Sequence, residues 1–198
     1  MLNAITGGVQ MADRVLVIGA HCDDESFGCL GTLLKHKEAG DEISFLWFTT
    51  GRDCEDGATK CCRYFNVRKC GLLRLKDQRL DQYDFVKEIV KPIEEAIVLY
   101  VPTVIYCPFI GDLNRDHRIV AEATMVACRP YKEYAPREVW MYQIPGSTEL
   151  GLREFRINRT ENIDKELKEK LIREWYPEEM INGREKIEEV EHFERWPR

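Results

Sequence analysis

The apolar residues of this chain fall into short continuous runs, separated by longer segments in which they recur every three or four positions. The first run, residues 15–18, is unbroken and β-branched, which is typical of a strand buried on both faces of a parallel sheet. A helical pattern follows at once, with Phe27, Leu30 and Leu34 on one stripe. Further strands are predicted at residues 43–49, 72–75, 104–107, 138–143 and 153–157, and further helices at 58–65, 85–100, 116–128, 165–175 and 184–193.

Strands that alternate with helices predict an α/β fold, a three-layer sandwich whose sheet is mostly parallel and whose crossovers are right-handed. Pro92 interrupts the pattern of the helix over 85–100, so we expect a kink there or a helix start near Lys91. The sequence has neither internal repeats nor a linker rich in Gly, Ser or Pro, which favours a single domain. Its predicted parts are a disordered lead-in (1–13), the core (14–160) and a helical carboxyl-terminal appendage of the same domain (161–198).

Composition and charge narrow the class of protein. The chain has 198 residues, of which 44% are apolar and 32% charged, as is ordinary for a globular domain. A formal net charge of −6 argues against a general nucleic-acid-binding surface. No apolar run reaches the length of a membrane span, and residues 1–14 do not resemble a secretory signal, so we expect neither membrane insertion nor export. Eight cysteines without such a signal favour reduced thiols in a cytoplasm over a disulfide framework.

Four ionisable residues follow the first predicted strand within five positions: His21, Asp23, Asp24 and Glu25. Open α/β sheets place their ligands at the carboxyl ends of strands. Burying this much negative charge is costly without a counter-ion, and a bound cation supplies one. The alternative is that Asp23 or Asp24 caps the next helix while the other groups are solvated. The combination of an imidazole with two adjacent carboxylates favours the cation.

A second polar loop follows the fourth predicted strand and contains Asp112, Asn114, Asp116 and His117. A lone histidine at the start of a helix is usually a surface residue. In a parallel sheet, however, the fourth strand is expected to lie near the first, so the two polar loops would face the same crevice. Their coincidence at two strand ends favours a functional role for His117.

Two imidazoles and one carboxylate, from His21, Asp24 and His117, form a ligand set found on catalytic zinc, with a position left open for water. Zinc lowers the pKa of its bound water to about 7. A carboxylate beside that water can act as a general base, and Asp23 is the candidate. Asp116 precedes His117 and is placed to hold its ring.

The sequence also resembles a known family, the PIG-L/LmbE-like deacetylases, over residues 15–148. The resemblance rests on the segments AHCDDE (20–25), LKDQRLD (75–81), GDLNRDHR (111–118) and MYQIPGSTE (141–149), of which the first and third resemble the family signatures AHPDDE and HPDH or NxDH. It implies a Rossmann-like, metal-dependent hydrolase that removes the acetyl group from N-acetylglucosamine-type sugars. By this resemblance, His21, Asp24 and His117 are the metal ligands, Asp23 is the base that activates water, and Asp116 supports the site.

The chain departs from the family pattern at two positions near the predicted site. Cys22 stands where the family usually has proline, and we expect its thiol to pack away from the metal. Asn114 stands where many members have a histidine proposed to stabilise charge in the transition state. An amide can donate a hydrogen bond to an oxyanion but cannot supply a proton. Asp23, once protonated by the water, is therefore the economical general acid.

The substrate-binding residues are less clearly marked by the sequence. The loop after the second strand is short, and Arg52 is our first candidate for the substrate-binding arginine of the family, with Arg63 as the second. Asp77 and Asp112 are predicted to bind substrate hydroxyls together with Arg52. A carboxylate after a strand is also often only a turn or helix cap.

The sequence thus predicts a zinc-dependent N-deacetylase, with iron(II) as the alternative metal, that acts on a small N-acetylated sugar. Two alternatives remain open: a non-catalytic member that binds metal or sugar, and a zinc amidase for a non-sugar N-acyl substrate. A nucleotide-binding oxidoreductase is disfavoured, because two carboxylates replace the closely spaced glycines that a pyrophosphate needs after the first strand. Homo-oligomerisation is left open.

Overall fold

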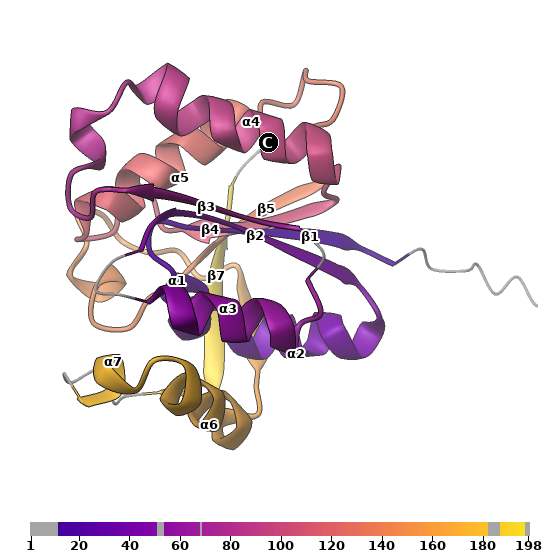
Figure 1. The fold of residues 1–198 in the computed structure, drawn as a ribbon, viewed down its shortest axis with the longest axis vertical. Helices are drawn as coiled ribbons and strands as arrows, with labels where there is room; N and C mark the ends of the chain where they lie inside the picture. The colour runs from indigo at the N-terminus through magenta and orange to yellow at the C-terminus, as the bar shows by residue number, and fades with distance from the viewer. Residues whose placement is uncertain (1–11, 51–53, 68, 182–186, 197–198) are drawn as a thin grey trace, which may run out of the picture.

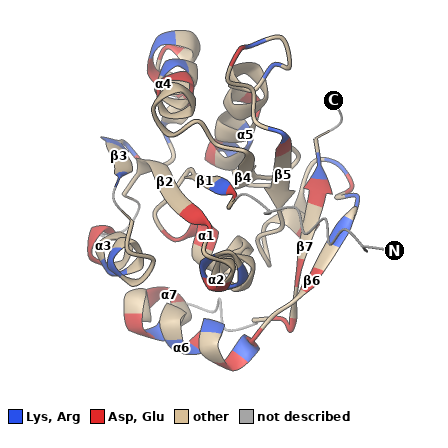
Figure 2. Cartoon of the chain, turned by 90° about the vertical axis from the view of Figure 1, so that its right-hand side faces the viewer, with Lys and Arg blue, Asp and Glu red and all other residues tan. Residues whose placement is uncertain are grey.

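Within the described residues, seven strands form one sheet in the order β3-β2-β1-β4-β5-β7-β6 (Figures 1 and 2). The computed structural model describes residues 12–50, 54–67, 69–181 and 187–196. The strands are β1 (Arg14–Gly19), β2 (Glu42–Thr49), β3 (Cys70–Leu75), β4 (Val104–Pro108), β5 (Glu138–Tyr142), β6 (Arg159–Asn162) and β7 (Val190–Arg195). The first five are parallel, and β7 runs antiparallel to both β5 and β6. This arrangement confirms the predicted mostly parallel α/β fold.

Strand β1 occupies the middle of the parallel part, between β2 and β4. Its apolar run, residues 15–18, is buried on both faces, as the unbroken pattern predicted. Val15 and Val17 enter one apolar core, and Leu16 and Ile18 enter the other. Because β1 and β4 are adjacent and parallel, the loops after their carboxyl ends lie side by side.

Helices cover both faces of the sheet (Figures 1 and 2). One face carries α1, α2 and α3, and the other carries α4 and α5. Their bounds are α1 (Asp24–Gly28), α2 (Leu30–Ala39), α3 (Glu55–Tyr64), α4 (Lys91–Tyr100) and α5 (Arg115–Ala127), with short turns η1 (Leu80–Gln82), η2 (Phe85–Val90, π-helical) and η3 (Thr148–Leu150). The start of α4 at Lys91 agrees with the break expected near Pro92, which lies in the first turn of α4. Over the described residues, no helix combines the length and apolarity needed to cross a bilayer.

The carboxyl-terminal segment packs outside α2 and α3 and then returns to the sheet. Helices α6 (Lys165–Trp175) and α7 (Pro177–Ile181) form a layer beyond the helices of that face (Figure 2). Leu171, Ile172 and Trp175 of α6 join the core on the same side of the sheet. Strand β1 begins at Arg14, and residues 1–11 of the predicted lead-in lie outside the described residues.

The structure corrects two predictions for this segment. Residues 153–157 do not form a strand, and the sixth strand is instead β6, at the edge of the sheet. The helix predicted over 184–193 is wrong as well, since β7 spans Val190–Arg195; residues 182–186 lie outside the described part of the chain. The charged residues of this segment are not typical of a buried strand. Glu191 and Glu194 can nevertheless be buried, because each forms an ion pair with a residue that is distant in sequence.

Candidate metal centre

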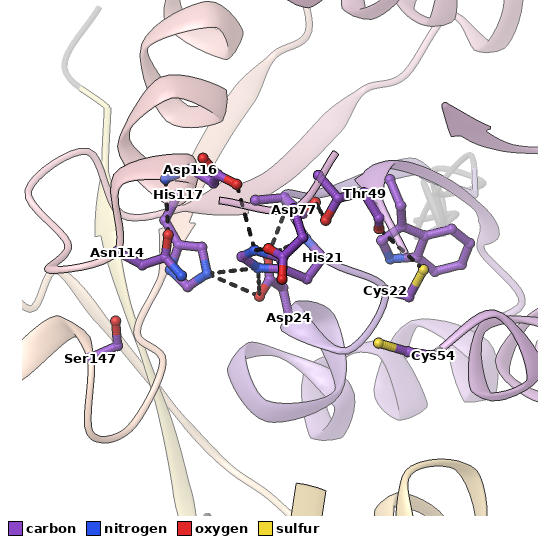
Figure 3. A network of polar contacts seen from close by, with 12 residues as sticks. His21, Cys22, Asp24, Thr49, Cys54, Asp77, Asn114, Asp116, His117 and Ser147 are labelled. Atoms are coloured by element: carbon purple, nitrogen blue, oxygen red, sulfur yellow. Dashed lines mark hydrogen bonds and ion pairs between the residues drawn. The ribbon is translucent and has the colours of Figure 1, made fainter. Parts of the chain in front are cut away.

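Three predicted ligands meet where β1 and β4 end. His21 lies in the loop after β1, Asp24 is the first residue of α1, and His117 lies in the first turn of α5, which follows the loop after β4. Their side chains converge in Figure 3. The distances are 3.3 Å from His21 Nδ1 to Asp24 Oδ1, 3.1 Å from His117 Nε2 to Asp24 Oδ1 and 3.2 Å between the two imidazole nitrogens.

These distances fit a shared cation. Ligand atoms around a tetrahedral zinc ion at about 2.0–2.1 Å lie roughly 3.3 Å apart. The three atoms form a nearly equilateral triangle of this size, and all three residues are buried. Two neutral imidazoles and a carboxylate are also a common donor set for zinc and for iron(II). The residues present therefore fit a bound metal ion.

The backbone fixes the direction of the Asp24 carboxylate. Its Oδ2 accepts hydrogen bonds from the N–H groups of Ala20, at 2.7 Å, and His21, at 2.9 Å. Its Oδ1 is thereby turned toward the two imidazoles. Burial alone would raise the pKa of Asp24, but His117 and His21 hold it well below its usual range, so this carboxyl stays ionised.

A further carboxylate stands behind each imidazole. Asp77 Oδ1 lies 3.0 Å from Nε2 of His21, and Asp112 Oδ1 lies 3.0 Å from Nδ1 of His117. Such partners orient a ligating histidine and keep the proton on the nitrogen that faces away from the metal. Nδ1 of His21 and Nε2 of His117 are thus the nitrogens presented to the centre.

Asp112 is a saturated acceptor in the structure. This fully buried carboxylate accepts hydrogen bonds from the backbone N–H of Asn114 at 2.8 Å, from His117 Nδ1, from Ser147 Oγ and from Thr148 Oγ1 at 2.7 Å. These four donors favour a supporting role for Asp112 at His117 over the predicted contact with substrate hydroxyls. Sequence reasoning missed Ser147 and Thr148 as members of the site, although the segment MYQIPGSTE that contains them had been noted.

Asp116 does not have the position predicted for it. Among the described residues, the carboxylate in contact with Nδ1 of His117 is that of Asp112. Asp116 instead accepts hydrogen bonds from the backbone N–H groups of Gln78, at 2.8 Å, and Leu80, at 3.3 Å. It therefore fixes the loop after β3, which carries Asp77.

A second group of potential ligands, His21, Asp77 and Asp116, overlaps the first. Its two carboxylates lie on the Nε2 side of the same imidazole, with Asp116 Oδ2 3.9 Å from His21 Nε2. A neutral imidazole offers one lone pair and carries a proton on its other nitrogen. The two groups therefore describe one candidate metal position with its supporting carboxylates rather than two independent candidates.

Asp23 is buried at the N-cap position of α1. Its side chain makes no capping hydrogen bond, while its backbone carbonyl accepts from the N–H groups of Ser26 and Phe27. The capping alternative therefore does not account for this carboxylate. Its negative charge is close enough to the imidazole of His21 to contribute to the raised pKa of that residue.

The remaining predicted residues have less central positions. Asn114 is the N-cap of α5; its Oδ1 accepts from the N–H of Asp116 at 2.9 Å, so its amide nitrogen is the end left to donate. Arg52 lies outside the described residues, and Arg63 is in the last turn of α3, the end that leads away from the site toward β3. As predicted, Cys22 packs away from the ligands, with its thiol donating to the carbonyl of Thr49 at 3.4 Å (Figure 3).

Metal binding is expected to release a proton from each imidazole. Burial lowers the pKa of both histidines, but Asp24 outweighs it in each case, with Asp77 adding to the effect on His21 and Asp112 on His117. The pKa of His117 rises to about 9, and that of His21 rises well above its usual value. These raised pKa values favour the protonated rings in the metal-free protein, whereas a ligating nitrogen must be free of its proton.

Calorimetric titration with zinc in buffers of different ionisation enthalpy measures this release. At pH 7 the heat should depend on the buffer, and the released protons should decrease once the pH exceeds about 9, since His117 is then already neutral. Heat that does not change with the buffer at pH 7 would contradict the raised pKa values of His21 and His117.

Comparisons with known proteins agree with this geometry. The chain is similar to the deacetylase YaiS of Escherichia coli K12, whose function is uncharacterised, at 24% identity over 158 residues, which cover 72% of this chain and 84% of the relative. Its fold is similar to that of the N,N'-diacetylchitobiose deacetylase from Pyrococcus horikoshii, with a TM-score of 0.71, 19% identity and coverage of 94% of this chain and 84% of the other.

The same fold also supports a different reaction. GalB, the 4-carboxy-2-hydroxymuconate hydratase of Pseudomonas putida KT2440, matches with a TM-score of 0.72 at 16% identity, over 95% of this chain and 98% of the other. Fold alone therefore does not select the chemistry. The family model described as PIG-L, GlcNAc-PI de-N-acetylase, matches residues 16–128, a span that contains all three predicted ligands and Asp23. The chain belongs to the PIG-L family.

Proposed function

We propose that this protein is a metal-dependent N-deacetylase that hydrolyses the acetamide of an N-acetylglucosamine-type sugar. The observation that carries the proposal is the triangle of His21 Nδ1, Asp24 Oδ1 and His117 Nε2, with sides of 3.1–3.3 Å. The buried carboxylate of Asp23 supports it, since its charge contributes to the raised pKa of His21. A metal held on one side by three ligands keeps positions open for water and substrate. Membership of a family that contains de-N-acetylases supports the same chemistry.

His21, Asp24 and His117 would hold the ion. When bound, zinc or iron(II) supplies Lewis acidity, which acidifies water and polarises an amide carbonyl. Asp23 then accepts a proton from the attacking water as the oxygen–carbon bond forms. The same carboxyl delivers that proton to the amine nitrogen as the carbon–nitrogen bond breaks. The products are acetate and the free amine.

The other residues of the site act on charge and orientation. The amide nitrogen of Asn114 is available to donate to the oxygen on which negative charge develops. Asp77 and Asp112 keep the imidazoles in place. For the hydroxyls of the sugar, we retain Arg52 and the partly exposed Asp77 as candidates.

We also propose zinc as the metal in use, with iron(II) as the alternative, since the same donors suit both. The cytoplasm is the proposed compartment: all eight cysteines are free thiols in the structure, as a reducing environment maintains them. A small N-acetylated sugar is the proposed partner, as the solved relative that acts on diacetylchitobiose suggests.

Acetate release from a panel of N-acetylated compounds tests the proposal. The panel contains N-acetylglucosamine, its glycosides, a nucleotide-linked form, diacetylchitobiose and several N-acetyl amino acids, each offered to protein reconstituted with zinc or iron(II). We expect acetate from at least one sugar. His192→Ala is the matched control, because this histidine lies on β7 and contacts Thr160, and it should leave the rate unchanged.

Two results would contradict the proposal. Release of acetate only from the amino-acid derivatives would favour a non-sugar amidase. Metal bound at one equivalent, with no compound cleaved, would favour a binding protein or a different reaction such as hydration.

A further inference from the structure

A tyrosine from the carboxyl-terminal segment contacts the loop that carries the proposed base. Tyr176 lies between α6 and α7, outside the residues that the family model matches. Its hydroxyl donates to the carbonyl oxygen of Cys22 at 2.5 Å, and the side chain is buried. Cys22 immediately precedes Asp23. This hydrogen bond therefore acts on the peptide group that leads directly into Asp23.

The ring of Tyr176 packs against Gly57 of α3, where the absence of a side chain leaves room for it. A Cβ atom on Gly57 would lie 2.0 Å from Cε1 of Tyr176, so the ring occupies the space that any other residue at position 57 would fill. The hydroxyl also lies 3.5 Å from Oε1 of Glu25, and that carboxyl is itself bound by Nε1 of Trp47 at 2.8 Å. These contacts leave the hydroxyl little freedom to turn away from the Cys22 carbonyl.

Asp23 is thus held by its backbone on both sides. The carbonyl before it accepts from Tyr176, and its own carbonyl accepts from the N–H groups of Ser26, at 3.0 Å, and Phe27, at 3.3 Å. The backbone dihedrals of a residue determine which side-chain rotamers it can adopt. A misplacement of about 1 Å at a reacting group can cost about 100-fold in rate. Loss of the Tyr176 hydrogen bond frees one of the two peptide groups that set this direction.

We propose that Tyr176 is a positioning residue, which orients the carboxylate of Asp23 by holding the Cys22 carbonyl. The inference rests on the proposed function, in which Asp23 is the base. It gives the carboxyl-terminal segment a part in catalysis, because Tyr176, which holds the loop before Asp23, lies outside the residues that the family model matches.

Tyr176→Phe tests this role, since it keeps the ring on Gly57 and removes only the donor. We expect kcat to fall by about 10-fold to 100-fold, with KM and metal content unchanged. Tyr142→Phe is the matched control: Tyr142 is also buried, and its hydroxyl donates to the carbonyl of Ile18 at 2.8 Å, three residues before His21. Both variants should lose a similar amount of Tm, but only Tyr176→Phe should lose kcat.

A second pair of variants separates positioning from stability. Gly57→Ala displaces the tyrosine ring without touching its hydroxyl and should reproduce the fall in kcat. In an Asp23→Asn background, Tyr176→Phe should cause no additional loss, because a residue that acts through Asp23 has nothing left to orient.

The possible failures are distinguishable. A kcat loss in Tyr142→Phe equal to that in Tyr176→Phe, or a further loss of full size in the Asp23→Asn background, overturns the positioning role and leaves the proposed function standing. Wild-type kcat in Asp23→Asn overturns the base assignment, and with it the proposal for Tyr176.

Discussion

Asp23→Asn is expected to lower kcat by about 10²–10⁴-fold, the usual contribution of a general base. Asparagine has nearly the same shape as aspartate but cannot accept a proton from water at neutral pH. Asp23 is buried, and its side chain does not cap α1, so asparagine at this position removes no capping hydrogen bond from the helix. It is not one of the three converging ligands, and the variant should therefore still bind one equivalent of metal.

Steady-state kinetics and metal analysis of one preparation check this prediction. Asp164→Asn is a suitable control, because Asp164 caps α6 through Leu167 N–H and asparagine caps helices equally well. That variant should keep the wild-type rate. The prediction fails if Asp23→Asn retains its rate, or if its loss of rate is explained by loss of metal.

The second large effect concerns stability. Glu191 is buried and connects its own strand, β7, to helices α2 and α6. From α2 it accepts the N–H groups of Gly31, at 2.7 Å on Oε1, and Thr32, at 2.8 Å on Oε2. From α6 it accepts Lys168 Nζ at 2.8 Å on Oε1. Lys168 is also buried and donates to the carbonyl of Phe27 at 2.7 Å. Breaking a buried pair leaves an uncompensated charge, so Glu191→Ala should reduce the free energy of unfolding by about 3–5 kcal/mol.

Urea unfolding monitored by circular dichroism measures this loss. Glu194→Ala provides the comparison, since its partner Arg153 has a side chain that is 41% exposed and remains hydrated when the pair is broken. The double variant Glu191→Leu/Lys168→Met removes both charges and should recover part of the stability lost by Glu191→Ala. Equal losses of unfolding free energy in Glu191→Ala and Glu194→Ala would contradict the larger contribution expected of the fully buried pair.

Local patterns were sufficient to predict the parallel core and the three side chains that meet at its edge. The apolar run of residues 15–18 specifies a strand buried on both faces. The polar loops after β1 and β4 meet because these two strands are parallel neighbours in the sheet. The convergence of His21, Asp24 and His117 is a consequence of that topology. A pattern of buried strands thus predicts where a site lies.

What local patterns could not predict depends on side-chain direction and long-range pairing. Asp112 and Asp116 are both close to His117 in sequence, and spacing alone does not say which of them faces Nδ1; the turn at the start of α5 selects Asp112. Charged residues made β7 resemble an exposed helix, since their partners, such as Lys168, are distant in sequence. Tyr176 was missed for the same reason.

The most direct test of the metal centre is a titration of metal-free protein with zinc while acetate release is followed. The rate should increase in proportion to added zinc up to one equivalent per chain and then stay level, and His117→Ala should show no such increase at these concentrations. Acetate release at the full rate from metal-free protein would contradict a metal-dependent site, and an unchanged titration of His117→Ala would contradict the assigned ligands.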